Sequence, residues 1–206
     1  MFVKMIKKIL VANRGEIACR VFATAKKMGI ATVAVYSDAD ADALHVQMAD
    51  EAVNIGPAAS SESYLVIEKI IQACVDTGAD AVHPGYGFLA ENAHFVKRLE
   101  EEGITFIGPA SHVITLLGDK IEARAAMEAA GLPTAKGSSE PISTVAVASK
   151  LADEIGYPVI IKAAAGGGGI GMQIVHVENE FGSALKLCQS RAKSAFGDDR
   201  VFVEKY

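Results

Sequence analysis

The stretch IIKAAAGGGGIGM, residues 160–172, places a run of four glycines between two apolar segments. Glycine has no Cβ, so consecutive main-chain N–H groups in such a run can turn toward one anion, and phosphate oxygens need donors of this kind. Lys162 ends the segment that leads into the glycines, where its ammonium group can meet the same phosphates. The stretch therefore predicts a glycine-rich flap over the phosphates of a nucleotide.

A flexible linker, a P-loop and a structural hairpin are the alternative interpretations of this run. Linkers lack apolar β-branched segments close by on both sides. No Gly-Lys-Ser/Thr triplet ends the run, and a strand rather than a helix is expected after it, which disfavours a P-loop. A hairpin turn needs fewer glycines than these four. The nucleotide flap is the hypothesis that these observations favour.

The segments around the glycines predict a small antiparallel α+β module over residues 136–206. Its expected elements, in order, are a helix, a strand, the glycine run, a strand, a helix and a last strand, at residues 145–155, 159–163, 166–169, 172–177, 179–196 and 201–204. Two helical patterns precede the module, at 111–117 and 120–130. We expect residues 118–135 to form a helical linker.

Residues 1–117 alternate strand and helix patterns, which predicts a Rossmann-like α/β domain with a parallel sheet. Residues 8–12 form a near-continuous apolar run, as expected of a strand buried on both faces. The other expected strands and helices lie at residues 31–36, 52–55, 81–83 and 104–107, and at 16–28, 44–48, 61–77 and 93–102, respectively. The turn after the first strand holds one glycine where a dinucleotide fingerprint needs three, so an NAD domain is disfavoured.

Composition excludes several classes of protein. Half of the 206 residues are apolar and 22% are charged, which excludes wholesale disorder. The formal charge of −5 argues against a nucleic-acid partner, and no apolar run is long enough to cross a membrane. The three cysteines are far apart, so neither a disulfide framework nor a structural zinc site is expected. This cysteine usage fits a reducing cytosol.

Three further motifs are ambiguous on their own. HPGYGFLAEN, residues 83–92, follows a predicted strand at the sheet edge where open α/β folds bind ligands, but a structural turn anchored by Phe88 and Leu89 explains it equally well. GDK, residues 118–120, opens a helix where a lysine can help to hold an anion, although a surface lysine fits too. Glu204 and Lys205 carry no signal by themselves.

Together and in order, these segments resemble the biotin carboxylase family. The resemblance covers essentially the whole chain and is strongest with the acyl-CoA carboxylases of propionyl type. The segments that carry it are NRGE (13–16), SDAD (37–40), ADEA (49–52), SYL (63–65), HPGYGFLAEN (83–92), FIGP (106–109), GDK (118–120) and the glycine run.

The resemblance implies a truncated ATP-grasp enzyme: a Rossmann-like domain, then the glycine-flap subdomain, ending before the carboxy-terminal ATP-grasp domain. The family uses MgATP to activate bicarbonate as carboxyphosphate and transfers the carboxyl group to carrier-bound biotin, within acyl-CoA, acetyl-CoA or pyruvate carboxylases. Expected partners are a biotin carboxyl carrier protein or domain, a carboxyltransferase subunit and, through the N-terminal domain, a second copy. The expected location is the cytoplasm, or the mitochondrial matrix in a eukaryote.

The resemblance also implies roles for individual residues. In ATP binding, Lys120 and Lys162 match two lysines that contact the phosphates, and the flap backbone is matched by Gly167, Gly168 and Gly169. Met172 matches an adenine-side contact, and Glu204 and Lys205 match the hinge that reads the adenine edge. Tyr86 and Gly87 match the loop that faces the biotin end of the site.

Two departures from the family pattern limit these expectations. Ile170 stands where many members carry a basic residue. The family's metal-binding glutamates (for Mg²⁺), bicarbonate-binding arginine and general base have no counterpart here, so we expect no catalytic or metal-ligating residue in this chain and no activity from it alone. Another ATP-grasp ligase, making a carbamoyl or acyl phosphate, and a non-catalytic Rossmann-like domain are the alternative functions.

Overall fold

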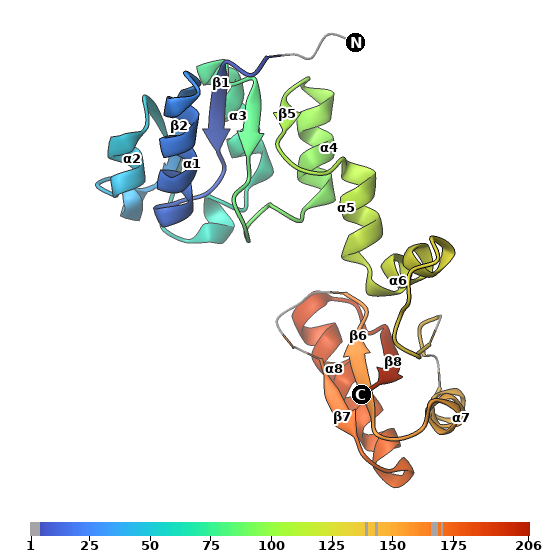
Figure 1. Cartoon of the computed structure of the whole chain (residues 1–206). Helices are drawn as coiled ribbons and strands as arrows, with labels where there is room; N and C mark the ends of the chain where they lie inside the picture. Colours follow the sequence, from blue (N-terminus) through green and yellow to red (C-terminus); the bar gives the residue numbers. More distant parts are fainter. Residues whose placement is uncertain (1–4, 139, 143, 166–168, 170) are drawn as a thin grey trace. The chain divides into compact units, whose positions relative to one another are not determined.

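The computed structural model describes residues 5–138, 140–142, 144–165, 169 and 171–206. Their contacts divide the chain into two compact units, Met1–Ile114 and Thr115–Tyr206 (Figure 1). Among the described residues, no helix is long and apolar enough to span a membrane.

The first unit is built on a five-stranded sheet in the order β3-β2-β1-β4-β5. All of its neighbouring strands are parallel, which confirms the predicted Rossmann-like sheet. The chain runs outward from β1 to β3 and then returns to β4 on the other side of β1, so the strand order reverses between β1 and β4. The strands are β1 (Lys8–Val11), β2 (Ala31–Ser37), β3 (Glu51–Gly56), β4 (Ala81–His83) and β5 (Thr105–Phe106).

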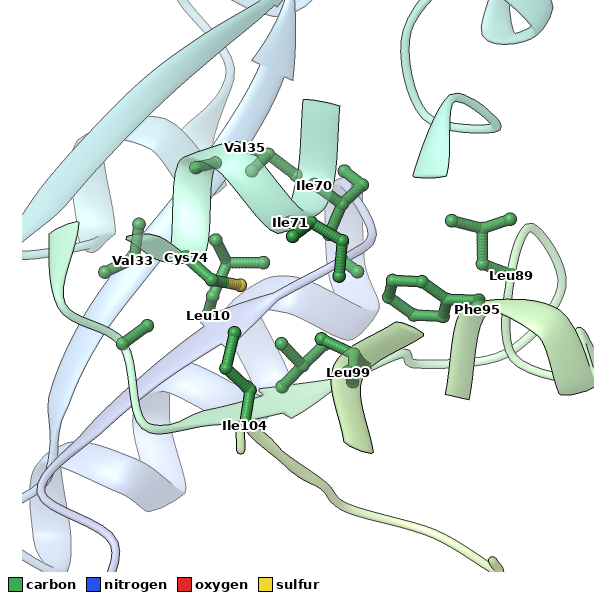
Figure 2. Close-up of a cluster of buried hydrophobic side chains, with 14 of the residues drawn as sticks. Leu10, Val33, Val35, Ile70, Ile71, Cys74, Leu89, Phe95, Leu99 and Ile104 are labelled. Atoms are coloured by element: carbon green, nitrogen blue, oxygen red, sulfur yellow. The ribbon is translucent and has the colours of Figure 1, made fainter. Parts of the chain in front are cut away.

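Helices pack on both faces of this sheet because the residues of its central strand alternate between two cores. Leu10 joins the larger core with residues of α3 and α4 (Figure 2). Val11 packs instead with residues of α1. Figure 2 shows Phe95 and Leu99 of α4 in the larger core. The helices are α1 (Gly15–Lys27), α2 (Leu44–Met48), α3 (Ile67–Thr77) and α4 (Ala93–Glu101), with short 3-10 turns at Asp38–Asp40 and Ser60–Glu62.

The helix predicted for residues 61–77 was wrong over its first turns. The regular helix begins only at Ile67, after Ser63 and Val66 have adopted non-helical backbone angles. Between them, the side chain of Tyr64 is fully buried in the core of the first unit. Burial of this ring therefore accompanies the break in the helical pattern.

The second unit holds a three-stranded antiparallel sheet, β7-β6-β8, which confirms the predicted module. Val159, Ile161 and Val203 pack on one face of it against α7 and α8. On the other face, Ile121 of α6 packs with Phe202. Its elements are α6 (Lys120–Ala129), α7 (Val145–Ile155), β6 (Val159–Ala163), β7 (Gln173–Val175), α8 (Glu178–Phe196) and β8 (Val201–Lys205), and the boundary between the two units falls within α5 (Ser111–Gly118).

Residues 118–135 belong to the second unit by their contacts, whereas the sequence sets them apart as a linker. The buried side chain of Ile121 explains this difference, since it anchors α6 to the sheet. The functional division into 1–117, 118–135 and 136–206 stays a prediction.

Candidate functional site

A cavity of about 510 Å³ lies in the second unit, where α6 meets β6 and β8. Its lining combines basic, acidic and apolar side chains from these elements and from the end of the glycine run: Leu117, Lys120, Ala123, Arg124, Met127, Thr134, Ala135, Lys162, Gly169, Met172, Phe202 and Glu204. Five of the predicted ATP residues are in this set. A larger cavity of about 780 Å³ shares Gly169 and Met172, but its described lining includes no lysine or arginine.

The register of β6 and β8 brings Lys162 and Glu204 together. Lys162 pairs with Phe202, and Ile160 pairs with Glu204, so Lys162 and Glu204 are diagonal neighbours on one face of the sheet. The Lys162 ammonium nitrogen lies 2.5 Å from a carboxylate oxygen of Glu204. A cation and an anion that are far apart in sequence are thereby fixed at the base of the cavity.

The start of α6 brings a second lysine to the same cavity. Asp119 caps the helix by accepting hydrogen bonds from the main-chain nitrogens of Ile121 and Glu122, at 2.9 and 3.3 Å. Lys120 follows the cap and donates its main-chain N–H to the oxygen of Ala164 at 3.3 Å. Lys120 and Lys162 therefore line one cavity from opposite elements, and the pair suits an anionic ligand.

The glycine run is described only in part. Gly167 and Gly168, which the resemblance assigns to the flap backbone, lie outside the described residues. Gly169 and Gly171 have φ of +79° and +74°, a region that L side chains rarely adopt. A Cβ on Gly171 would also lie 3.1 Å from that of Ala163. Both conformation and space thus require glycine where the run rejoins the sheet.

The side chain of Lys205 makes different contacts from that of Glu204, although the two residues are adjacent in sequence. Its ammonium group donates to the main-chain oxygens of Gly156, Tyr157 and Pro158, at 2.8, 3.1 and 3.2 Å. The side chain of Lys205 therefore holds the turn between α7 and β6 and does not line the cavity. Its predicted contact with ATP stays a prediction.

The first unit carries its specific motifs at the point where the strand order reverses. Asn13 follows β1, and its buried side-chain amide donates to the oxygens of Pro84 and Tyr86, which follow β4, at 2.9 and 2.8 Å. Gly85 lies between these two acceptors with φ of +66°, and a Cβ there would be 2.7 Å from Asn13 Nδ2. Ligands of open α/β sheets bind at such a reversal, beyond the carboxyl ends of the strands.

A charged and aromatic cluster supports the same loop. The Tyr64 hydroxyl donates to Asp40 at 2.6 Å, and the Tyr64 ring stacks on Phe88 with ring centroids 5.1 Å apart. The Arg14 guanidinium lies over both rings and 3.2 Å from Asp40. Phe88 has φ of +39°, unusual for a residue with a side chain, and the stacking holds it there.

The pKa values of Asp40 and Tyr64 are both shifted, because both groups are partly buried and hydrogen-bonded to each other. Burial raises the pKa of Asp40, but hydrogen bonds from Tyr64, Ser37 and Arg14 outweigh it and leave the pKa below its ordinary value of 3.8. Burial, together with the hydrogen bond to Asp40, raises the pKa of Tyr64 to about 12. At neutral pH the carboxylate is therefore charged and the phenol keeps its proton.

Tyr86 and Gly87 lie at the exposed tip of this loop. The Tyr86 ring is 61% exposed and its hydroxyl donates to Glu16, whose carboxylate raises the pKa of Tyr86. Gly87 has φ of +66° with open space around it, so conformation alone explains the glycine. Tyr86 is thus presented to solvent by a loop that Asn13 fixes from beneath.

Several residues that shape these sites have no role predicted from the sequence. Asn13, Asp40 and Tyr64 lie within motifs that were noted, but their hydrogen bonds join segments far apart in sequence. The sequence does not mark Arg124 as a site residue, because an arginine on an amphipathic helix has the same pattern as any surface arginine. Among the described residues, no group of three or more His, Cys, Asp or Glu side chains could hold a metal ion.

Two family models match the chain. The model described as "Biotin carboxylase, N-terminal domain" matches residues 5–114, which are more than half of the chain. The model described as "Carbamoyl-phosphate synthase L chain, ATP binding domain" matches residues 119–206, the part that holds the cavity with the two lysines.

Two relatives and one solved structure show the extent of the likeness. Biotin carboxylase 1 of Bacillus subtilis is 54% identical over 202 residues, 98% of this chain and 45% of that protein. The propionyl-CoA carboxylase alpha chain of Ruegeria pomeroyi is 53% identical over 202 residues, 98% of this chain and 30% of that protein. The crystal structure of the biotin carboxylase domain dimer of Hydrogenobacter thermophilus 2-oxoglutarate carboxylase, with MgADP, ADP and bicarbonate, has a TM-score of 0.93 at 48% identity, over 99% of this chain and 45% of that chain. The chain spans less than half the length of each.

Proposed function

The chain belongs to the biotin carboxylase family, and on this premise we propose that it is the amino-terminal part of an ATP-dependent ligase that carboxylates carrier-bound biotin with bicarbonate. The proposal concerns the full-length polypeptide, because the relatives extend well beyond the length of this chain. We expect residues 1–206 alone not to complete the reaction.

The observation that carries the proposal is the pair Lys120 and Lys162 in one cavity, inside the segment that matches an ATP-binding domain. The triphosphate would lie between these two ammonium groups, and main-chain N–H groups of the glycine run would be further donors to it. Met172 and Phe202 supply apolar contact for a base, and Glu204 supplies a hydrogen-bond acceptor for an amino group. These are the needs of an adenine nucleotide.

Mg²⁺ is implied by the family, and a related structure contains MgADP. The described residues of this chain offer no group of three or more ligating side chains for it. We therefore propose that its protein ligands lie outside these 206 residues. This chain's own Lys120 and Lys162 would hold the phosphates.

The first unit is proposed to serve the biotin end of the reaction. Tyr86 and Gly87 would face the ureido ring, on a loop held by Asn13 and by the cluster of Arg14 and Tyr64. The proposed partners are a biotin carboxyl carrier protein or domain, a carboxyltransferase subunit and a second copy of the polypeptide. The proposed location is the cytoplasm, or the mitochondrial matrix in a eukaryotic host.

The proposal is tested by assaying ADP release from ATP by the full-length polypeptide. ADP release should need bicarbonate and rise on addition of free biotin, with label from bicarbonate recovered on biotin. A rate of ATP hydrolysis that depends on neither biotin nor bicarbonate would contradict the proposal.

A second candidate is a different ATP-grasp ligase that makes a carbamoyl or acyl phosphate. It is favoured by the family description matched by residues 119–206 and disfavoured by the one matched by residues 5–114. ADP release stimulated by ammonia, and not by biotin, would favour this candidate. The choice of acyl-CoA subtype stays a proposal, since the relatives of 53% and 54% identity have different names.

A further inference from the structure

Arg124 occupies an unexpected place in the cavity of the second unit. It comes from the middle of α6, and its side chain is only 11% exposed. Its guanidinium Nη1 lies 3.8 Å from Oε1 of Glu204, while Lys162 lies 2.5 Å from the other carboxylate oxygen, Oε2. One carboxylate therefore stands between two cations that reach it from different elements.

The guanidinium is held in this position by its other contacts. Its Nε is 2.9 Å from the Glu128 carboxylate and its Nη2 donates to the main-chain oxygen of Ala135. Thr134 donates to the same Glu128 oxygen at 2.5 Å. Arg124 thus joins α6 to the segment around Ala135 and Gly137, which pairs with β8 at Glu204. These contacts restrict the position of the guanidinium.

Gly137 leaves the space for this approach. A Cβ on Gly137 would lie 2.5 Å from the oxygen of Val203, 2.8 Å from Arg124 Nη1 and 3.0 Å from Glu204 Cγ. A side chain at this position would clash with the Val203 oxygen first, and it would also crowd the guanidinium and the Glu204 side chain. The close arrangement of Arg124 and Glu204 therefore depends on a glycine from a third segment.

The two cations have unequal freedom. Lys162 has a flexible side chain that is 29% exposed, and among the described residues its ammonium group binds only Glu204. Arg124 has three protein partners. A triphosphate entering the cavity would compete with Glu204 for the ammonium of Lys162, and the carboxylate would then lose its nearest cation.

We propose that Arg124 is a positioning residue that compensates the charge of Glu204 and so allows Lys162 to move from Glu204 to the phosphates of the nucleotide. This inference rests on the proposed function, because it takes the ligand to be ATP. The residue acts on the phosphates only through Lys162 and Glu204. Its effect should consequently appear for a nucleotide with phosphates and not for the nucleoside.

The test compares ATP with adenosine as ligands of the full-length polypeptide, by titration calorimetry. Arg124→Met should weaken ATP binding about tenfold, or about 1.4 kcal/mol, and adenosine binding less than about twofold. Arg124→Lys keeps the charge and should recover ATP binding to within about threefold of the unchanged protein. Arg191→Met, which removes an exposed arginine on α8, is the matched control and should change neither affinity.

A double-mutant cycle separates charge compensation from a general role in folding. In a Glu204→Gln background no charge needs compensation, so adding Arg124→Met should change ATP affinity less than about twofold. Equal weakening of ATP and adenosine, or a tenfold loss that persists in the Gln background, would overturn the inference while leaving the proposed function intact. Absence of ATP binding by the unchanged protein would overturn both.

Discussion

The side-chain amide of Asn13 donates a 2.8 Å hydrogen bond to the main-chain oxygen of Tyr86. This bond joins the segments that follow β1 and β4, the two strands between which the sheet order reverses. Asn13 is 4% exposed and makes a second bond, to the oxygen of Pro84. A buried polar group with two such bonds holds the loop of Tyr86 more firmly than the packing of that exposed ring could.

Asn13→Ala should destabilise the protein by about 2–3 kcal/mol, since it removes the two hydrogen bonds that the amide donates and leaves the oxygens of Pro84 and Tyr86 without that donor. It also removes the hydrogen bond that the Asn13 side-chain oxygen accepts from the main-chain nitrogen of Arg14. Urea unfolding of the full-length polypeptide measures this loss. Asn54→Ala is the control, because Asn54 also makes two side-chain hydrogen bonds but is exposed, and it should cost less than about 1 kcal/mol. Equal costs for the two variants would show that Asn13 does not hold the loop.

Tyr64→Phe removes a buried hydroxyl that donates to Asp40 and accepts from the main-chain nitrogen of Ser37. The ring and its stacking on Phe88 remain, so we expect a loss of about 1–3 kcal/mol from the unpaired partners. Thermal unfolding measures the change, with Tyr36→Phe on β2 as the matched control. A Tyr64→Phe protein as stable as the Tyr36→Phe protein would contradict the claim that the hydrogen bonds around Asp40 stabilise the fold.

Asp40 gives a prediction about pH. Its pKa in the folded protein lies below 3.8, so its contribution to stability is fully present above that value and is lost as the pH falls through the folded pKa. The unchanged protein should exceed Asp40→Asn in unfolding free energy at pH 6, and the two should converge as the pH falls below about 3.8.

Asp42→Asn is the control for this pH series, because Asp42 is exposed just beyond Asp40. The control should remain close to the unchanged protein throughout, and carboxylates such as Asp50 and Asp198 contribute equally to every variant. A difference between the unchanged protein and Asp40→Asn that stays constant with pH would rule out the lowered pKa as its origin.

Gly137→Ala tests the close packing beside β8. The new Cβ would lie 2.5 Å from a main-chain oxygen, which cannot move as a side chain could, and we expect a loss of about 1–3 kcal/mol. Gly118→Ala is the control, since nothing lies within 4 Å of a Cβ there, and its effect should stay within about 0.5 kcal/mol. Denaturant unfolding of both variants gives the comparison; equal stability would mean that the segment beside β8 can shift without cost.

Both sheets could be predicted from the sequence because each strand is a short apolar run bounded by turns. The parallel direction of the first sheet follows from the alternation of strand and helix, and the antiparallel direction of the second was expected from two strands joined by the glycine run, whereas the strand orders came from the structure. The start of α3 could not be predicted, because the 61–77 pattern contains Tyr64, whose burial depends on Asp40 and Phe88 elsewhere in the chain.

The glycine run singled out Lys162 and the family resemblance added Lys120; the structure places both in one cavity, and their roles in ATP binding stay predictions. Arg124 and Glu204 were beyond local reasoning, because what distinguishes them is a contact between α6 and β8 across most of the second unit's sequence. The family resemblance assigned Lys205 to the ATP site together with Glu204, and that assignment stays a prediction. Alternation along β8 directs the two side chains to different faces, which the resemblance did not indicate.

The central claim is that the cavity with Lys120 and Lys162 binds the phosphates of ATP, and ATP affinity of the full-length polypeptide tests it most directly. Lys162→Met is compared with Lys150→Met, which removes an exposed lysine on α7. The account predicts that Lys162→Met weakens ATP binding at least about tenfold, as expected for a lost charge-assisted contact, while Lys150→Met leaves it unchanged. Equal ATP affinities of the two variants would contradict the account.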